Sequence, residues 1–427
     1  MTEQLKLKLN DSKATRWGAL VIVAFTMMAA YYVNDVVAPL KTMLETDLAW
    51  SSTDFGFFTG GYSFLNVFFL MLIWGGLILD RFGIRFTGKL ATILMVGGTA
   101  LEYYAMTGLA GADATLFGIN EIFGYKTGVF VAFAGYSIFG VGAEVAGITV
   151  SKIIAKWFKG KELATAMGVQ VALARIGSQA GYAVAIPLAR AFGISTPVLL
   201  GLVLLLGGMI AFFVFAVMDK KLDKQMEAAA IAAGTEDEEE KFSFKDVKNI
   251  LVNPGFWLIA LLCVLFYSCV FPFQKFASEL MIIKYGINEN VAGTFAGLPA
   301  LGALILTPVF GGFIDKRGKS ASIMLLGSAM LICVHFIYAI PDINYWLVAI
   351  VLMIILGIAF SLVPSAMWPA VAKIFPVSQL GTAYALIFFI QNIGLWGIPT
   401  LIGWVLDAYC ISGKKPVSYT HLTLPTN

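Results

Sequence analysis

Two residues of opposite charge, Glu144 and Arg175, stand inside long apolar stretches, where ionisable side chains are costly and are commonly functional. Glu144 lies about 15 residues before the polar turn 158–161, and Arg175 lies about 15 residues after it. If both stretches are helices, both residues lie roughly 20 Å from that turn and therefore at the same depth. An arginine can bind a carboxylate through two hydrogen bonds, and a glutamate can bind an ammonium group. The pair could hold a small zwitterion, or it could form a salt bridge that only joins the two helices.

The other candidates for substrate binding carry a weaker signal. An internal repeat with an offset of 217 residues (361 minus 144) aligns Glu144 with Ser361 and Arg175 with Asn392, so the second copy offers neutral hydrogen-bonding groups. Asp35, near the end of the first apolar stretch, could bind a solute or a proton, or could cap a helix. Aromatic side chains could line a site, although they more often serve packing. The further candidates are Asp35, Tyr62, Phe271, Trp368, Gln391 and Asn392.

A short polar motif with glycines and an aspartate occurs twice, at 76–85 and again at 311–319. Glycines permit tight turns and close helix contacts, and the aspartate can accept hydrogen bonds from a helix N-terminus. The cations of the motif could pair with carboxylates across one membrane face and break those contacts when that face opens. Anchoring of positive charge at the membrane surface is the alternative. The candidate gating residues are Gly76, Asp80, Arg81, Gly83, Arg85, Asp315, Lys316 and Gly318.

The composition places these residues in membrane helices. Of the 427 residues, 59% are hydrophobic and 13% charged, and a soluble domain carries about twice that charged fraction. Stretches of about 20 apolar residues span a bilayer as helices, whereas a barrel would need short alternating strands. Lys275 and Glu279, one turn apart in one stretch, are expected to pair with each other. The eleven predicted spans are 17–40, 55–79, 88–107, 129–156, 163–191, 197–218, 255–282, 290–314, 320–340, 345–371 and 379–406.

The spans divide into two halves of similar sequence, which predicts an all-α polytopic membrane protein with two pseudo-symmetric six-helix bundles. Residues 1–218 would form the first bundle, 219–253 a charged cytoplasmic linker, and 254–411 a second bundle of which five helices are present. Residues 412–427 do not read as natural protein sequence and are left out of the fold. We therefore expect a twelfth helix that this sequence lacks.

The distribution of positive charge predicts the orientation. With the N-terminus in the cytoplasm, twenty-one lysines and arginines fall in inner segments and five in outer ones. Cytoplasmic segments of membrane proteins carry such an excess. The sequence therefore predicts a multi-pass protein of the cell (inner) membrane with a cytoplasmic N-terminus.

Other classes of function find little support in the sequence. The four cysteines and two histidines have no metal-ligand spacing, and three of the cysteines fall in apolar spans. No nucleophile, metal cluster or pair of carboxylates suggests an enzyme, and no cofactor is expected. The central linker is too short and too charged for a signalling domain. The expected partners are a small-molecule substrate and the lipid bilayer, not nucleic acid, and an accessory subunit stays an open question.

Several segments together indicate a family. The motifs YYVNDVVAPL, GLILDRFGIR, WFKGKEL, ARIGS, VFPF, QLGTAY and QNIG begin at residues 31, 76, 157, 174, 270, 379 and 391. With these motifs the chain resembles, over nearly its whole length, the family of major facilitator superfamily domain-containing protein one, which comprises lysosomal dipeptide uniporters and microbial relatives. The resemblance implies a major facilitator fold and a secondary transporter of dipeptides, whose two charged ends suit Glu144 and Arg175. An organic-anion or sugar carrier of the same superfamily is the alternative.

Overall fold

The computed structural model describes residues 8–111, 114–159, 161–233, 244–375, 377–412 and 415–416, and these residues are almost entirely helical. The acidic run 236–240 and the tail 417–427 lie outside the described residues. The first half holds α1 (Lys13–Val36), α2 (Lys41–Asp47), α3 (Ser52–Phe68), α4 (Met71–Thr107), α5 (Thr127–Trp157), α6 (Leu163–Phe192) and α7 (Thr196–Ala233). The second half holds α8 (Phe244–Val252), α9 (Pro254–Ile283), α10 (Glu289–Ala296), α11 (Leu298–Arg317), α12 (Ser320–Ala339), α13 (Trp346–Ile374) and α14 (Val377–Val405).

Short elements precede, connect or follow these helices. They are the 3₁₀ turns η1 (Leu9–Asp11) and η2 (Ala38–Leu40), the π-helical turn η3 (Leu406–Cys410), and the two antiparallel strand pairs β1 (Glu121–Ile122) with β2 (Tyr125–Lys126) and β3 (Ile411–Ser412) with β4 (Lys415–Pro416). The described part of the chain thus has an all-α fold, and its strands are short and pair with their neighbours in sequence.

Each of the eleven predicted spans falls largely on helical residues, although Gly297 interrupts the predicted span 290–314 between α10 and α11. Within the described part of the chain, eight helices are long and apolar enough to cross a membrane, or nine if the bent pair α3 and α4 counts as one span. The prediction of an unbroken helix over 55–79 is wrong, because α3 ends at Phe68 and the chain bends by 58° before α4. At this bend Leu70 has a left-handed backbone with φ 54°. α4 in turn contains a second break, at Gly83, where φ is 73° and ψ is 174°.

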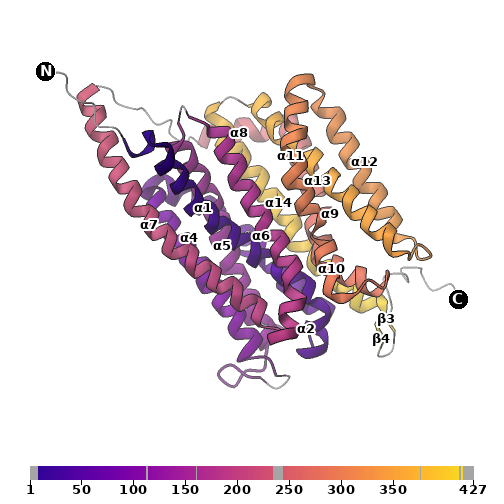
Figure 1. Ribbon diagram of the computed structural model, residues 1–427. Helices are drawn as coiled ribbons and strands as arrows, with labels where there is room; N and C mark the ends of the chain where they lie inside the picture. Colours follow the sequence, from indigo (N-terminus) through magenta and orange to yellow (C-terminus); the bar gives the residue numbers. More distant parts are fainter. Residues whose placement is uncertain are drawn as a thin grey trace.

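The two halves stand side by side. Figure 1 shows α1, α4, α5, α6 and α7 together on one side of the molecule and α9 to α14 on the other. α8 and the first turns of α1 lie at one end of the helices, which we call the α8 end, and α2 and the β3–β4 pair lie at the opposite end, the α2 end (Figure 1). These two ends are the two sides from which a central site could be reached.

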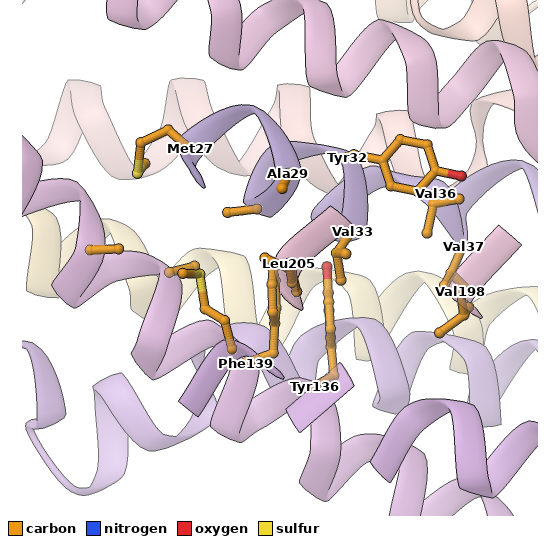
Figure 2. Packing of buried hydrophobic residues seen from close by; sticks show 14 of the residues in the cluster. Met27, Ala29, Tyr32, Val33, Val36, Val37, Tyr136, Phe139, Val198 and Leu205 are labelled. Carbon is orange, nitrogen blue, oxygen red and sulfur yellow. The ribbon is translucent and has the colours of Figure 1, made fainter. Parts of the chain in front are cut away.

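Each half has its own apolar core. In the first half, side chains of α1 such as Met27 and Val33 pack against Phe139 of α5 and Leu205 of α7 (Figure 2). A second cluster lies mainly on α9, α12, α13 and α14 of the second half, with Phe266 and Met353 among its buried residues, and it also includes Ala38 and Tyr182 of the first half. Since lipid gives no hydrophobic gain between helices, such contact relies on close packing.

Candidate functional site

Glu144 on α5 is half-buried and is held by Tyr62 of α3. The Tyr62 hydroxyl donates a hydrogen bond of 3.0 Å to Oε1 of Glu144. The two helices touch beside this bond, because a Cβ on Gly140 would lie 2.0 Å from the Tyr62 carbonyl oxygen. Tyr62 is thus placed to orient the Glu144 carboxylate, and the hydrogen bond between them depends on the close contact of α3 with α5. A role of Tyr62 in substrate binding stays a prediction.

Arg175 on α6 is also half-buried, and its guanidinium lies over two aromatic rings. Its Cζ is 5.5 Å from the ring centre of Tyr31 on α1 and 5.1 Å from that of Phe360 on α13. Among the ion pairs of the described residues, none joins Arg175 to Glu144. The alternative of a salt bridge that only joins α5 and α6 is therefore not realised in this conformation.

Asp35 lies in a network of its own near the α2 end, not free to face a solute. Its Oδ1 accepts a hydrogen bond from Lys275 at 3.0 Å, and its Oδ2 accepts one from Ser178 at 2.6 Å. Lys275 also donates to the Asn34 carbonyl at 2.5 Å and to the Tyr136 hydroxyl at 3.3 Å. Because Asp35 is on α1 and Lys275 on α9, this ion pair connects the two halves.

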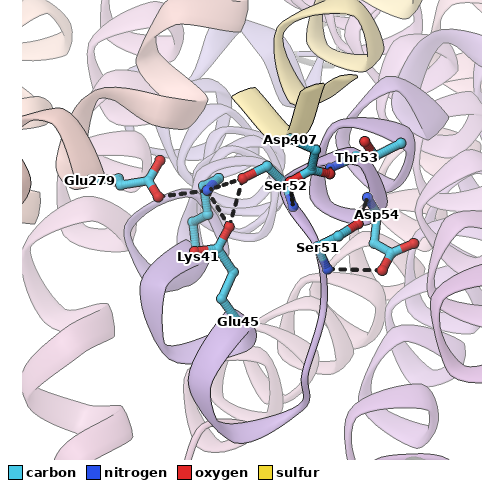
Figure 3. A network of polar contacts seen from close by, with 8 residues as sticks. All are labelled: Lys41, Glu45, Ser51, Ser52, Thr53, Asp54, Glu279 and Asp407. Atoms are coloured by element: carbon cyan, nitrogen blue, oxygen red, sulfur yellow. Dashed lines mark hydrogen bonds and ion pairs between the residues drawn. The ribbon is translucent and has the colours of Figure 1, made fainter. Parts of the chain in front are cut away.

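Lys41 makes a second connection between the halves (Figure 3). It is 1% exposed, and its Nζ donates to Oε1 of Glu279 at 2.6 Å and to the Ser52 hydroxyl at 2.8 Å. Glu45, one turn away on α2, accepts a further bond from the same amine. The expected pair between Lys275 and Glu279 is wrong, because each of these residues instead bonds a partner in the first half. Helix periodicity alone cannot reveal such distant partners.

Close helix contacts join the halves at the same α2 end. A Cβ on Gly56 would lie 2.3 Å from the Pro399 carbonyl oxygen, which brings α3 against α14. A Cβ on Gly293 would lie 2.2 Å from the Tyr182 carbonyl oxygen, which brings α10 against α6. The carboxylate of Asp407 accepts two further hydrogen bonds, donated by the first N–H groups of α3, as Figure 3 shows. The α2 end is therefore closed by backbone contact and by buried charge.

The predicted gating residues lie at the α8 end, where the ion pairs stay within one half. Asp80 accepts a hydrogen bond of 3.0 Å from Lys152 of α5, and Arg85 pairs with Asp223 of α7 at 2.7 Å. Asp219, which has no exposed surface, accepts hydrogen bonds from Lys156 at 2.7 Å and from the Trp157 indole at 2.9 Å. Among the described residues, no ion pair joins the halves at this end.

The glycines and the remaining cations of the motif differ in their roles. Gly83 has the positive φ that a tight turn requires, and so does Gly318 in the second copy, with φ 67°. Gly76 has no atom within 4 Å of where a Cβ would stand, so a close helix contact does not occur there in this conformation. Arg81 lies over the ring of its neighbour Phe82, and Lys316 is exposed. The side chain of Asp315 lies outside what the structure describes.

The remaining substrate candidates lie in the second half. Phe271 packs edge-on against Phe360, one of the two rings over Arg175, while Trp368 stacks on Phe388 of α14. Asn392 donates to the Phe388 carbonyl of its own helix at 2.9 Å, and its Oδ1 is buried without a hydrogen-bond partner. Gln391 is buried and accepts a weak contact of 3.7 Å from the Cys263 thiol.

Sequence reasoning missed two residues that contact Arg175. Tyr31 stands in the YYVND motif, and Phe360 stands immediately before Ser361, the repeat partner of Glu144. Ser361 itself bonds the Gly357 carbonyl of its own helix at 2.7 Å. The internal repeat could therefore have pointed to Phe360 through its neighbour Ser361. The side chain that contacts Arg175 here is aromatic and not polar.

Several known proteins are similar to this chain over most of its length. The lysosomal dipeptide transporter MFSD1 of Homo sapiens is 29% identical over 409 residues, covering 92% of this chain and 81% of that protein. The nucleoside transporter NupG has a similar solved structure, with a TM-score of 0.70, 12% identity and 94% of each chain covered. A bacterial homologue of the lysosomal transporter Spinster, solved in an inward-facing and unoccupied conformation, has a TM-score of 0.64 at 16% identity, covering 93% of this chain and 84% of that one.

A family model described as Major Facilitator Superfamily matches residues 20–397. The matched segment covers most of the chain and includes all the residues that form the site and nearly all the contacts between the halves. With the helical fold and its two halves, this match shows that the chain belongs to the Major Facilitator Superfamily.

Proposed function

We propose that this protein is a secondary transporter that carries dipeptides by alternating access. The observation that carries the proposal is that Glu144 and Arg175 are both half-buried in the helical region, on adjacent helices, and do not pair with each other. An ammonium group would bind the carboxylate that Tyr62 orients, and a carboxylate would bind the free N–H donors of Arg175. The similarity to proteins named lysosomal dipeptide transporters supports this choice of substrate.

The contacts between the halves support an inward-facing state. Two buried ion pairs and close backbone contacts join the halves at the α2 end, whereas the ion pairs of the α8 end stay within the first half. The excess of positive charge near the α8 end favours a cytoplasmic position for it. We infer a multi-pass cell-membrane protein with a cytoplasmic N-terminus, whose site would be reached from the cytoplasm in this conformation.

The two copies of the glycine–aspartate motif would close the cytoplasmic side in the opposite state. Asp80, Arg81 and Arg85 from the first copy would then meet the second half, and Asp315 and Lys316 from the second copy would meet the first half. Their present partners, such as Lys152 for Asp80, are exposed enough to exchange. Exposed ion pairs contribute little stability, so such an exchange costs little.

Uptake into proteoliposomes tests the substrate. We expect wild-type protein to take up a dipeptide, and Glu144→Gln and Arg175→Gln to lower kcat/KM between about ten- and a hundredfold, because a hydrogen bond to a charged group contributes about 1.5–3 kcal/mol. Glu121→Gln, at an exposed residue of β1, is the matched control and should transport normally.

An N-acetylated dipeptide separates the candidate functions, because it lacks the ammonium group. The wild type should discriminate strongly against it, and Glu144→Gln should remove most of that discrimination. If Glu144→Gln instead leaves transport intact and a simple organic anion competes as well as a dipeptide, the protein is an anion carrier.

A further inference from the structure

Arg175 is held by aromatic rings and not by an acid. Among the described residues it has no acceptor within hydrogen-bonding distance, whereas its Cζ lies 5.5 Å from the ring centre of Tyr31 and 5.1 Å from that of Phe360. A guanidinium within about 6 Å of a ring centre is attracted to the negative face of the ring. Since Tyr31 belongs to α1 and Phe360 to α13, the two halves hold the cation together.

The Phe360 ring has little freedom to move away. It is 3% exposed, and it packs edge-on against Phe271 at 5.4 Å and against Tyr267 at 6.3 Å, measured between ring centres. Close-packed aromatic clusters of this kind keep their rings in one orientation. The position of Phe360 therefore limits where the guanidinium can lie.

We propose that Phe360 is a positioning residue for the substrate carboxylate, a role that rests on the proposed function. Rings attract the face of the guanidinium, whereas its five N–H donors lie in its plane and stay available for two carboxylate oxygens. Phe360 thus keeps Arg175 ready to bind, without competing for its donors as an aspartate would. The carboxylate site is shared, because the first half supplies the charge of Arg175 and the ring of Tyr31, and the second half supplies the ring of Phe360.

The internal repeat strengthens this assignment. Phe360 precedes Ser361, which occupies the position in α13 that Glu144 occupies in α5. The same turn of two related helices therefore faces the two ends of the substrate, with a carboxylate in one half and an aromatic ring in the other. Because Phe360 on α13 contacts Arg175 on α6, carboxylate binding also depends on the position of α13 relative to α6.

Ring fluorination at position 360 tests the proposal with little change of shape. Phenylalanine with none, one, two or three ring fluorines is incorporated at this site, and the KM and Vmax of dipeptide uptake are measured in proteoliposomes. Fluorine weakens the negative ring face stepwise, so KM should rise stepwise by about two- to thirtyfold in total, while Vmax stays within twofold. Phe360→Tyr, which keeps an electron-rich ring, should stay near the wild-type KM.

Phe266 provides the matched control, because its ring lies 6.5 Å from that of Phe360 in the same cluster but is not one of the rings over Arg175. The same fluorination series at Phe266 should leave KM unchanged. A flat KM series at Phe360, or equal effects at Phe360 and Phe266, would overturn the positioning role while wild-type dipeptide uptake continues. Absence of dipeptide uptake by the wild type would instead refute the proposed function on which this role rests.

Discussion

Asp35 and Lys275, 240 residues apart in the chain, form an ion pair of 3.0 Å that joins the two halves near the α2 end. Each of the two side chains is 11% exposed, so water screens the pair little. Ser178 bonds the other oxygen of Asp35 from α6, one turn beyond Arg175. The contact that closes this end therefore shares a helix with the proposed carboxylate site.

Asp35→Asn should shift the protein toward a state that is open at the α2 end. The substitution removes one of the two buried ion pairs between the halves and leaves Lys275 charged, so we expect a shift of about 1.4 kcal/mol, or roughly tenfold in the ratio of the two states. Spin labels attached at Thr46→Cys and Tyr345→Cys, in a protein whose native cysteines are replaced, measure the distance between the two halves. In Asp35→Asn a population with a longer distance between the labels should appear. Asp342→Asn, at an exposed residue, should leave the distances unchanged, and an unchanged distribution in Asp35→Asn would contradict the prediction.

Lys41→Met should destabilise the fold more than Glu279→Gln. Loss of Lys41 removes the buried cation that contacts the carboxylates of both Glu45 and Glu279, at a cost of about 3–5 kcal/mol. After Glu279→Gln, Lys41 still bonds Glu45 and the Ser52 hydroxyl. The melting temperature in detergent measures both effects, and equal melting temperatures would show that the cation is not the centre of this network.

Gly97 and Gly98 are neighbours on α4 that should respond oppositely to alanine. A Cβ on Gly98 would lie 2.4 Å from the Phe139 backbone nitrogen, so Gly98→Ala must separate α4 from α5 and should cost about 1–3 kcal/mol. Gly97 has no atom within 4 Å of that position, and Gly97→Ala should be neutral or stabilising by up to about 1 kcal/mol. Thermal unfolding of both variants decides this, and a tolerated Gly98→Ala would exclude the close α4–α5 contact.

Gly76 and Gly83 belong to one motif, but alanine at Gly83 should lower stability, whereas alanine at Gly76 should affect transport and not stability. Gly83→Ala places a side chain on a backbone with φ 73° and ψ 174°, a conformation nearly restricted to glycine, and should cost about 1–3 kcal/mol of folded stability. Gly76→Ala meets no neighbour here and should unfold as the wild type does. If Gly76 approaches the other half when the cytoplasmic side closes, the same variant should slow uptake. Normal uptake by Gly76→Ala would remove this residue from the proposed gate.

The sequence alone determined the features that depend on local chemistry. Apolar runs long enough to cross a bilayer placed the helices, and equal spacing from one polar turn placed Glu144 and Arg175 on adjacent helices. The need for positive φ at Gly83 was likewise readable from a glycine in a polar turn. Hydrophobicity and backbone conformation act over a few residues, so they leave a signal in the order of the residues themselves.

Only the tertiary structure decided which distant residues meet. One-turn spacing favoured a pair between Lys275 and Glu279, yet Asp35 and Lys41 of the other half bond them instead. The break after Phe68 and the rings over Arg175 were equally hidden. Ion pairs and ring contacts between helices depend on how the two halves are placed against each other, and residue spacing within one helix carries no information about that placement.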